Sequence, residues 1–472
     1  MQLTSKASFL FLSVLLISSL VTACGGGADG VDNSEPTIKN LTLFVHGFDK
    51  QGHKTSGVYG AEHHDPTIEK FQQLGNSNAK SNILNIIKTT TYYGDKAPHY
   101  FTKNDIQELQ SVTNQWGGGI PRYAVIIAKY ANYLMQQEKV ESINIVSGSM
   151  GSLVTRWMIE KDIEGLASSK KIAKWYSLEG VIRGNYAADR KEYIEKFYGG
   201  DGLESIDITH MSTDWISDNL QNPVSDAINP NYKYIRMGMQ ASTDDGLSNG
   251  LLTKLLFING QFSANDGTQR VKDCHFNKVA ESARFNNLPP TFTLIHENHL
   301  SLKDHMGAWA NVMTFLNSKK RVTIRLTDAK VDDIQENIQW YNKQAEVIFE
   351  SKVYSPQIEK LWGITQAIAE NTRRGATLPV THYSEDGEEK SLQQLVLDQF
   401  VPAGETELMI HFKAHEVDNA PKYGVYESVN EGYDFIGGAN ITVPLKNGTY
   451  AFKGDNWSFH LEVEVNEYPE TP

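Results

Sequence analysis

The sequence predicts two sheet architectures in one chain: a mostly parallel sheet wrapped by helices, followed by an antiparallel β-sandwich. Between residues 40 and 319, short apolar runs alternate with longer amphipathic stretches, the pattern of a parallel sheet covered by helices. From residue 320 to 472, apolar and polar residues alternate with a period of two, which is typical of strands with one buried face. A chain of 472 residues is also too long for one typical domain.

Composition limits the class of protein. Hydrophobic residues make up 40% of the chain and aromatic residues 10%, which is enough for sizeable cores and excludes a mostly disordered chain. The 44 Lys and Arg residues against 57 Asp and Glu give a net charge of −13. Because nucleic acids and acidic membrane surfaces attract basic proteins, we expect no nucleic-acid partner.

The N-terminus has the features of an export signal. Lys6 precedes an apolar stretch over residues 9–21 that is too short to span a bilayer comfortably. Residues 21–24 (VTAC) then resemble a bacterial lipobox, in which the cysteine is acylated and becomes the first residue of the mature protein. We therefore expect residues 1–23 to be a lipoprotein signal peptide. An ordinary signal peptide followed by an incidental cysteine is the alternative.

The segment after this signal fits a lipid anchor. Residues 24–39 are Gly-rich and polar, which predicts a flexible lipidated tether beginning at Cys24. Gly25 rather than Asp follows the cysteine, which by resemblance favours the outer membrane in a cell that has one. With Cys24 acylated, Cys274 has no intramolecular partner, so a disulfide framework is excluded. Cys274 has a neighbouring His but no strand-turn setting, which argues against a nucleophile.

Six apolar runs are the expected strands of the parallel sheet: residues 41–45, 83–91, 142–146, 175–181, 232–240 and 291–295. Two amphipathic stretches, residues 121–137 and 153–160, are predicted to be helices. The first of them begins with a proline, whose fixed φ suits the first turn of a helix.

The second half of the chain is predicted to be a sandwich of about 150 residues. Apolar residues alternate clearly over residues 322–326. Residues 441–452 predict a hairpin that turns at Asn447-Gly448, a dipeptide favoured in tight turns. One helix is predicted over residues 356–373. We expect this half to have its own core and to supply no catalytic group.

A nucleophile is indicated by residues 146–151 (VSGSMG), where an apolar strand is followed by a helix. This is the small-x-Ser-x-Gly pattern of a nucleophile elbow, with Ser147 in place of the usual first glycine. A nucleophile at the apex of a sharp turn needs small residues two positions to either side, and Ser147 and Gly151 are small. The helix N-terminus also directs Met150 N–H toward a developing oxyanion. We therefore predict Ser149 as the nucleophile.

With this elbow, the chain resembles the α/β-hydrolase superfamily and, within it, the bacterial lipases. The first expected strand ends in residues 44–48 (FVHGF), which are similar to the oxyanion-loop motif of those lipases. The resemblance implies that Phe48 N–H is the second oxyanion donor. It covers most of residues 40–318 at the level of motifs, with large inserts between them, and implies an α/β-hydrolase catalytic domain over residues 40–319.

In the α/β-hydrolase fold the catalytic acid follows the nucleophile along the chain. Asp201 and Asp245, each followed by Gly-Leu, are the candidates. Asp245 follows the apolar run 234–239 and would lie at the C-terminal end of a strand, as the Asp-Gly motif of the lipases does. Asp201 follows a charged helical stretch and is better explained as a loop turn. We therefore predict Asp245 as the acid, with its neighbour Asp244 as an alternative.

The base is expected after the last strand of the parallel sheet. His296, His299 and His305 all follow the apolar run 292–295, and only His299 has the Asn-His-Leu setting that resembles the lipase motif. We predict His299 as the base, with the other two in structural positions. Bacterial lipases with the closest motifs bind calcium through an acid two residues after this His. Here that position is Ser301, so no calcium site is implied.

No metal and no cofactor are expected. Residues 62–65 (EHHD) contain metal-ligand types, but adjacent His side chains project in different directions and no second pair stands at ligand spacing. A solvated loop is the expected structure of this segment.

The function that these motifs predict is a membrane-anchored serine carboxylic-ester hydrolase, a lipase or esterase. Ser149, Asp245 and His299 would form the triad, and the substrate would be an ester, most of all a lipid ester. Two alternatives stay open. One is a non-catalytic surface-binding lipoprotein with a relic hydrolase domain, and the other is an acyltransferase with the same triad. The presence of all three triad motifs in order favours an enzyme.

Overall fold

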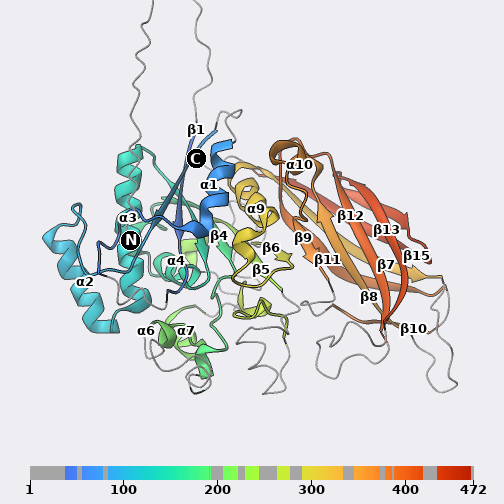
Figure 1. Cartoon of the computed structure of the whole chain (residues 1–472), viewed down its shortest axis with the longest axis horizontal. Helices are drawn as coiled ribbons and strands as arrows, with labels where there is room; N and C mark the ends of the chain where they lie inside the picture. Colours follow the sequence, from blue (N-terminus) through green and yellow to red (C-terminus); the bar gives the residue numbers. More distant parts are fainter. Residues whose placement is uncertain are drawn as a thin grey trace, which may run out of the picture. The chain divides into compact units, whose positions relative to one another are not determined.

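The computed structural model (Figure 1) places residues 37–472 in one compact unit. The described residues are 38–49, 56–77, 83–190, 192, 206–221, 229–243, 263–276, 290–332, 345–372, 378–384, 387–417 and 433–468. The expected signal peptide, the expected tether and Cys24 all lie outside the described residues.

The first sheet has six strands in the order β2-β1-β3-β4-β5-β6, and every neighbouring pair is parallel. The predicted mostly parallel sheet wrapped by helices is therefore confirmed. The strands are β1 (Ile38–Val45), β2 (Ile83–Thr90), β3 (Ile143–Gly148), β4 (Ile172–Leu178), β5 (Arg236–Ser242) and β6 (Thr291–Ile295). All six carboxyl ends meet at one edge, where ligands bind in open sheets of this kind.

Helices cover both faces of this sheet. Leu43 and Val45 of β1 belong to the apolar cluster that contains α3 and α4, whereas Phe44 belongs to the cluster that contains α1 and α9. This alternation explains why β1 is a continuous apolar run, since both of its faces are buried. The helices of this part are α1 (Glu69–Ser77), α2 (Lys103–Trp116), α3 (Gly119–Glu138), α4 (Met150–Glu160), α6 (Ile206–His210), α7 (Thr213–Asn219) and α9 (Met306–Asn317).

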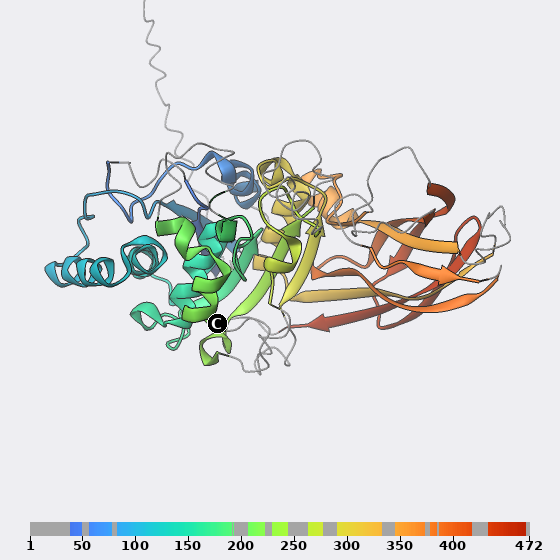
Figure 2. The ribbon, with the colours of Figure 1, turned by 90° about the horizontal axis from the view of Figure 1, so that it is seen from below.

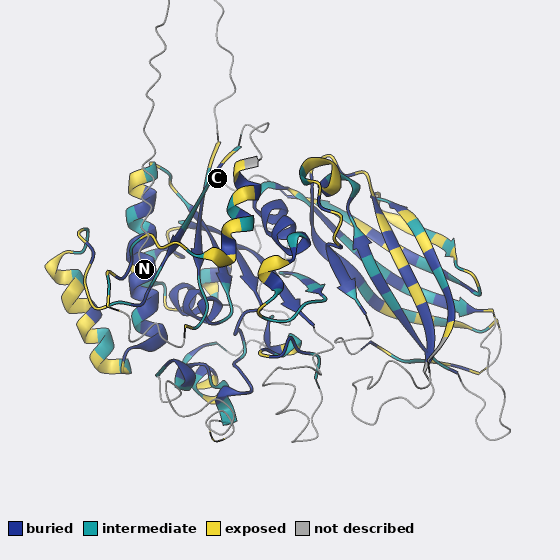
Figure 3. Ribbon diagram, in the orientation of Figure 1, coloured by how far each residue is buried: buried dark blue, intermediate teal, exposed yellow. Residues whose placement is uncertain are grey.

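The second part is a sandwich of two antiparallel sheets, as the period of two predicts. Their strand orders are β10-β8-β12-β13, with β9 also paired to β8, and β11-β7-β15-β14. Buried and exposed residues alternate along these strands (Figure 3). The elements are β7 (Lys320–Val331), β8 (Ala345–Tyr354), α10 (Pro356–Trp362), β9 (Ala369–Asn371), β10 (Thr381–Tyr383), β11 (Glu389–Val401), β12 (Glu407–Val417), β13 (Tyr433–Pro444), β14 (Gly448–Lys453) and β15 (Trp457–Glu467).

Two local expectations about the sandwich are wrong. The strands on either side of Asn447-Gly448 do not form a hairpin, because β13 pairs with β12 and β14 pairs with β15 in the other sheet. Asn447 instead accepts a hydrogen bond from Val465 N through its side-chain oxygen. The helix expected over residues 356–373 ends at Trp362, because Gly363 adopts a left-handed conformation (φ 68°) that caps it.

One apolar core continues from the parallel-sheet part into the sandwich. Phe315 of α9 contacts Phe400 of β11, with 5.5 Å between ring centroids. The guanidinium of Arg236 lies 4.3 Å from the centroid of Phe400, and its Nη1 donates to Ser318 O at 2.8 Å. In Figure 1 and Figure 2, α9 lies between the parallel sheet and the sandwich. The expectation of a separate core after residue 320 does not hold, because β11 rather than solvent covers the apolar face of α9.

Among the helices of the described residues, none combines the length and the apolar character needed to cross a bilayer.

The shared core predicts that the two parts unfold together. Phe400 is buried, so Phe400→Ala should lower the free energy of unfolding by about 3–5 kcal/mol. Urea unfolding followed by tryptophan fluorescence and by far-UV circular dichroism should give one coincident transition for the wild type and for the variant. The control is Phe435→Ala, since that side chain is 52% exposed and should change stability by less than about 0.5 kcal/mol. Two separate transitions would contradict the shared core.

Candidate active site

Ser149 occupies a sharp turn between β3 and α4. Its backbone angles are φ 49° and ψ −124°, a conformation that side-chain-bearing residues rarely adopt and that costs on the order of 1–3 kcal/mol. Neighbouring backbone holds it there, because Ser149 N donates to Leu178 O at 2.9 Å and Val181 N donates to Ser149 O at 3.1 Å. The turn therefore rests on the end of β4 as well as on its own strand.

Close packing explains the glycines around this turn. A Cβ on Gly151 would lie 2.3 Å from both Val45 O and His46 O, so α4 could not approach β1 with any larger residue there. A Cβ on Gly47 would lie 2.9 Å from Ser149 Cβ. The loop after β1 and the turn after β3 are thus in direct contact, which places the expected oxyanion loop against the expected nucleophile.

Ser147, which replaces the usual first glycine, has a specific use. Its fully buried hydroxyl accepts a hydrogen bond from Trp175 Nε1 at 2.8 Å and lies 3.0 Å from Ser152 Oγ. Ser177 Oγ donates to Ser152 Oγ at 2.9 Å. These bonds tie β3, β4 and α4 together directly beneath the turn.

His299 lies beside Ser149 although 150 residues separate the two. His299 Nε2 is 3.1 Å from Ser149 Oγ, and His299 Nδ1 is 2.8 Å from Asp266 Oδ2. His299 N also donates to Asp266 O at 2.9 Å, which fixes the two loops to each other. The structure therefore brings together two of the three predicted triad residues and adds an acid that the sequence analysis did not name.

Asp266 is fully enclosed and well supplied with donors. It is 1% exposed, and its Oδ1 accepts hydrogen bonds from Thr268 N at 2.8 Å and Gln269 N at 2.6 Å. Bonds of this kind stabilise the ionised form of a carboxylate. One signal could have found it, because Asp266 is also followed by a glycine and stands between β5 and β6.

Asp245, its alternative Asp244, and Asp201 all lie outside the described residues.

Glu179 is a second buried carboxylate at His299. It directly follows β4, in a left-handed conformation (φ 48°), and its Oε2 is 3.1 Å from His299 Nδ1. Ser242 Oγ, at the end of β5, donates to Glu179 Oε1. Sequence reasoning missed Glu179 because nothing in the spacing shows that the end of β4 lies next to the histidine loop.

These carboxylates control the charge of the histidine. Burial alone would lower the pKa of His299, but the negative charges of Asp266 and Glu179 raise it to about 9. Burial raises the pKa of Glu179 well above its ordinary value, although the positive charge of His299 opposes this rise. Because the pKa of His299 is higher than in the unfolded chain, its contribution to stability is complete below pH 6.5 and is lost as the pH rises through about 9.

The loop after β1 is held rigidly. Tyr92 Oη donates to His46 O and to Gly47 O, at 2.9 and 2.8 Å, and the rings of His46 and Tyr92 stack with centroids 4.1 Å apart. Phe48 follows directly and is half-buried. Met150 is the first residue of α4, where a backbone N–H has no partner within the helix.

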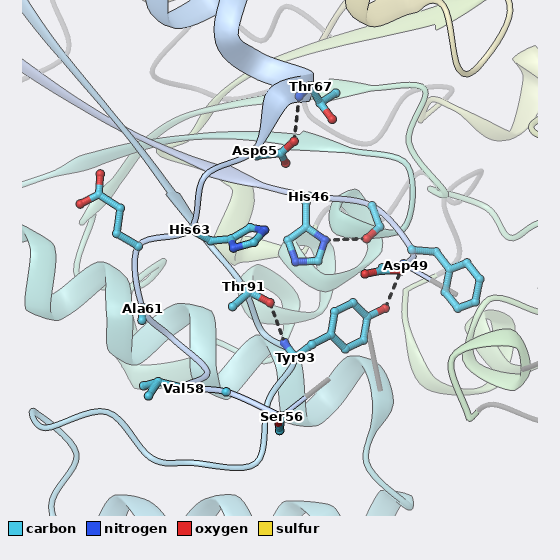
Figure 4. Close-up of a pocket in the computed structure, with 14 residues that line it drawn as sticks. His46, Asp49, Ser56, Val58, Ala61, His63, Asp65, Thr67, Thr91 and Tyr93 are labelled. Carbon is cyan, nitrogen blue, oxygen red and sulfur yellow. Dashed lines mark hydrogen bonds between the residues drawn. The ribbon is translucent and has the colours of Figure 1, made fainter. Parts of the chain in front are cut away.

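A cavity of about 630 Å³ adjoins this loop (Figure 4). In this view the side chain of His63 points toward the ring of His46, and Asp49 and Asp65 also line the cavity. Its lining includes backbone and side chains of the expected oxyanion loop, and much of it is polar: His46, Gly47, Phe48, Asp49, Ser56, Gly57, Val58, Ala61, Glu62, His63, Asp65, Thr67, Thr91 and Tyr93. The loop after β1 therefore borders a space suited to a polar group.

The other sequence candidates have structural positions. His305 caps α9, since its Nδ1 accepts a hydrogen bond from Ala308 N at 3.1 Å. His296 directly follows β6 and contacts Thr372. Cys274 is fully buried, and burial raises its thiol pKa well above the ordinary value, so it is no nucleophile.

Within the described residues there are two clusters, each of which brings together three side chains of the types that bind metal ions. The first, Glu179, Asp266 and His299, is already joined by the hydrogen bonds described above. The second lies on three strands of the sandwich and consists of Asp328, Glu389 and His460. Residues 62–65 do not converge in this way, because Glu62 pairs with Lys88 and Asp65 caps a short helix at Thr67.

No protein-family model and no curated protein sequence matches the chain. Among solved structures, the mature form of the Bacillus licheniformis lipase BlEst2 is 13% identical, with a TM-score of 0.39, over 61% of this chain and 96% of its own. Phospholipase PlaB from Legionella pneumophila is 9% identical, with a TM-score of 0.37, over 81% and 87%. Est1E from Butyrivibrio proteoclasticus is 12% identical, with a TM-score of 0.30, over 60% and 90%. Likenesses this weak concern the fold alone and assign no activity.

The contact at Gly151 predicts a severe effect of one added methyl group. Gly151→Ala should destabilise the protein by about 3 kcal/mol or more, because both atoms in its way are backbone carbonyl oxygens. Gly148→Ala is the matched control, since its Cβ would meet only Phe44 Cζ at 3.7 Å. Thermal unfolding of the two variants measures the difference, and equal melting temperatures would contradict the packing described here.

Proposed function

We propose that the protein is a serine ester hydrolase that forms an acyl-enzyme on Ser149. The observation that carries this proposal is an unbroken relay, with Ser149 Oγ 3.1 Å from His299 Nε2 and His299 Nδ1 2.8 Å from Asp266 Oδ2. The relay begins at a serine in a strained turn next to a helix N-terminus, which is the setting that acyl transfer requires.

In the proposed reaction, Ser149 Oγ attacks the carbonyl carbon of the ester while its proton passes to His299 Nε2. His299 then gives that proton to the alkoxide as the bond to the alcohol breaks. Water attacks the acyl-enzyme, loses a proton to His299, and the acid leaves as Ser149 recovers that proton. Asp266, in place of Asp245, keeps the remaining proton on His299 Nδ1 and stabilises the imidazolium.

The carbonyl oxygen becomes negatively charged during each attack and needs hydrogen-bond donors. We assign this role to Phe48 N–H and Met150 N–H, because the first follows the loop packed against Ser149 and the second begins α4. One such donor contributes about 10²–10³ to kcat in serine hydrolases.

Carboxylic esters, including lipid esters, are the proposed substrates. The polar cavity beside the oxyanion loop would receive the alcohol portion of the ester, since its carboxylates and imidazoles can hydrogen-bond to hydroxyl groups. The complete relay supports catalysis over a relic domain that only binds, because each member would be free to change if no reaction depended on it.

A lipid anchor completes the proposal. The VTAC string at residues 21–24 supports acylation of Cys24 and attachment of the exported protein to a membrane.

The anchor predicts a specific change in the expressed protein. In cells fed labelled palmitate, Cys24→Ser should abolish lipid labelling and release the protein from the membrane fraction or leave its precursor unprocessed. Cys274→Ala is the control that should remain labelled, because Cys274 is buried in the folded chain. Persistent labelling of Cys24→Ser would refute the lipoprotein assignment.

The nucleophile can be tested with a fluorophosphonate probe, which reacts covalently with activated serines. The wild type should be labelled at Ser149, and Ser149→Ala should lose all labelling. Ser168→Ala, which changes an exposed serine, should be labelled at the wild-type rate. Labelling that persists in Ser149→Ala would contradict the assignment of Ser149 as the nucleophile.

The same assay separates the two acids. Asp266→Asn should slow labelling at least about 10-fold, since a triad needs its orienting carboxylate, while Asp245→Asn should have little effect. The reverse order would restore the acid that the sequence analysis named.

A further inference from the structure

The relay contains one more carboxylate than a triad needs. Glu179 Oε2 is 3.1 Å from His299 Nδ1, and Asp266 Oδ2 is 2.8 Å from the same nitrogen. The side chains of both acids are at most 5% exposed. A buried carboxylate without a purpose is costly, so two of them on one nitrogen call for a functional explanation.

The two acids reach His299 from different parts of the fold. Glu179 directly follows β4 in the middle of the parallel sheet, between Ser149 after β3 and Ser242 at the end of β5. Asp266 belongs to the connection between β5 and β6. Glu179 is therefore fixed by the sheet itself, whereas Asp266 is fixed by the loop that carries it.

The hydrogen bonds of Glu179 hold its carboxylate in one orientation. Glu179 N donates to Gln240 O at 2.8 Å, which locks the backbone to β5. Ser242 Oγ donates to Oε1, which leaves Oε2 directed at His299. Glu179 has a positive φ of 48°, close to the φ of 49° at Ser149 one strand away.

We propose that Glu179 is a second positioning residue for His299, sharing its Nδ1–H with Asp266 and able to hold the ring when Asp266 is removed. This inference rests on the proposed function, because it concerns the same histidine. The charged groups that face Glu179 are His299, Asp266 and Glu297, and the last two repel its negative charge.

The first test is the pH dependence of fluorophosphonate labelling between about pH 5 and pH 10. His299 accepts the Ser149 proton only when neutral, so the wild-type rate should rise with an apparent pKa of about 9. Glu179→Gln removes the carboxylate whose negative charge raises the pKa of His299. It should therefore move this rise about one pH unit lower and reduce the plateau rate a few-fold, because one acceptor of the Nδ1–H is weakened.

The second test is a double-mutant cycle. Asp266→Asn alone should slow the plateau rate about 10- to 100-fold, less than the roughly 10⁴-fold loss seen when a triad has a single acid. Adding Glu179→Gln should remove about 100-fold more, far beyond its effect in the wild type. If Glu179 only supported the fold, the loss of labelling rate in the double variant would equal the product of the two single losses, and the pH profile would not move.

Two further variants guard against misfolding. Glu160→Gln alters another buried carboxylate, one that binds Arg156 Nε at 2.7 Å, and should lower the melting temperature without moving the pH profile. Ser242→Ala removes the donor to Glu179 without touching any carboxylate. It should shift the profile in the same direction as Glu179→Gln but by less.

The outcomes separate this inference from the proposed function. If the wild type is not labelled at Ser149, the proposed function fails. This inference alone is overturned by a different result, in which the wild type is labelled at Ser149 but Glu179→Gln does not move the pH profile. In that case the double variant would also show only the product of the two single effects, and Glu179 would have no positioning role.

Discussion

The site depends on how closely α4 approaches β1. At Gly151 the helix lies so near the carbonyl oxygens of Val45 and His46 that no side chain fits between them. This approach presses the loop after β1 against Ser149 and fixes the strained turn that presents its hydroxyl. The loop after β1 and the hydroxyl of Ser149 are therefore positioned by one contact.

Buried charge has opposing effects at this site. Two carboxylates orient His299 firmly, but they also raise its pKa to about 9, so the ring is mostly protonated at neutral pH and unable to accept a proton. Asp266 accepts hydrogen bonds from two backbone N–H groups, whereas Glu179 accepts one from Ser242 Oγ and burial raises its pKa well above the ordinary value. The surroundings of Asp266 and Glu179 therefore determine both how firmly His299 is oriented and how basic its ring is.

Local patterns predicted the elements of the fold and the positions of Ser149 and His299, because strand-turn-helix chemistry is written in adjacent residues. Asp266 and Glu179 escaped prediction because their role depends on where loops and strand ends meet in space. The same limit explains Asn447-Gly448, whose turn preference does not say which sheet the next strand will join. An apolar face likewise does not identify what covers it, and β11 covers α9.

The continuous core has a consequence for biosynthesis. The apolar face of α9 is complete once residue 317 is made, but β11, which covers it, ends at residue 401, and Tyr468 N donates to Lys319 O at 2.8 Å only after nearly the whole chain exists. The first half therefore cannot bury this face of α9 until most of the second half has been synthesised. Folding of the two halves is coupled for this reason, and the uncovered face of α9 would be prone to aggregation until β11 is available.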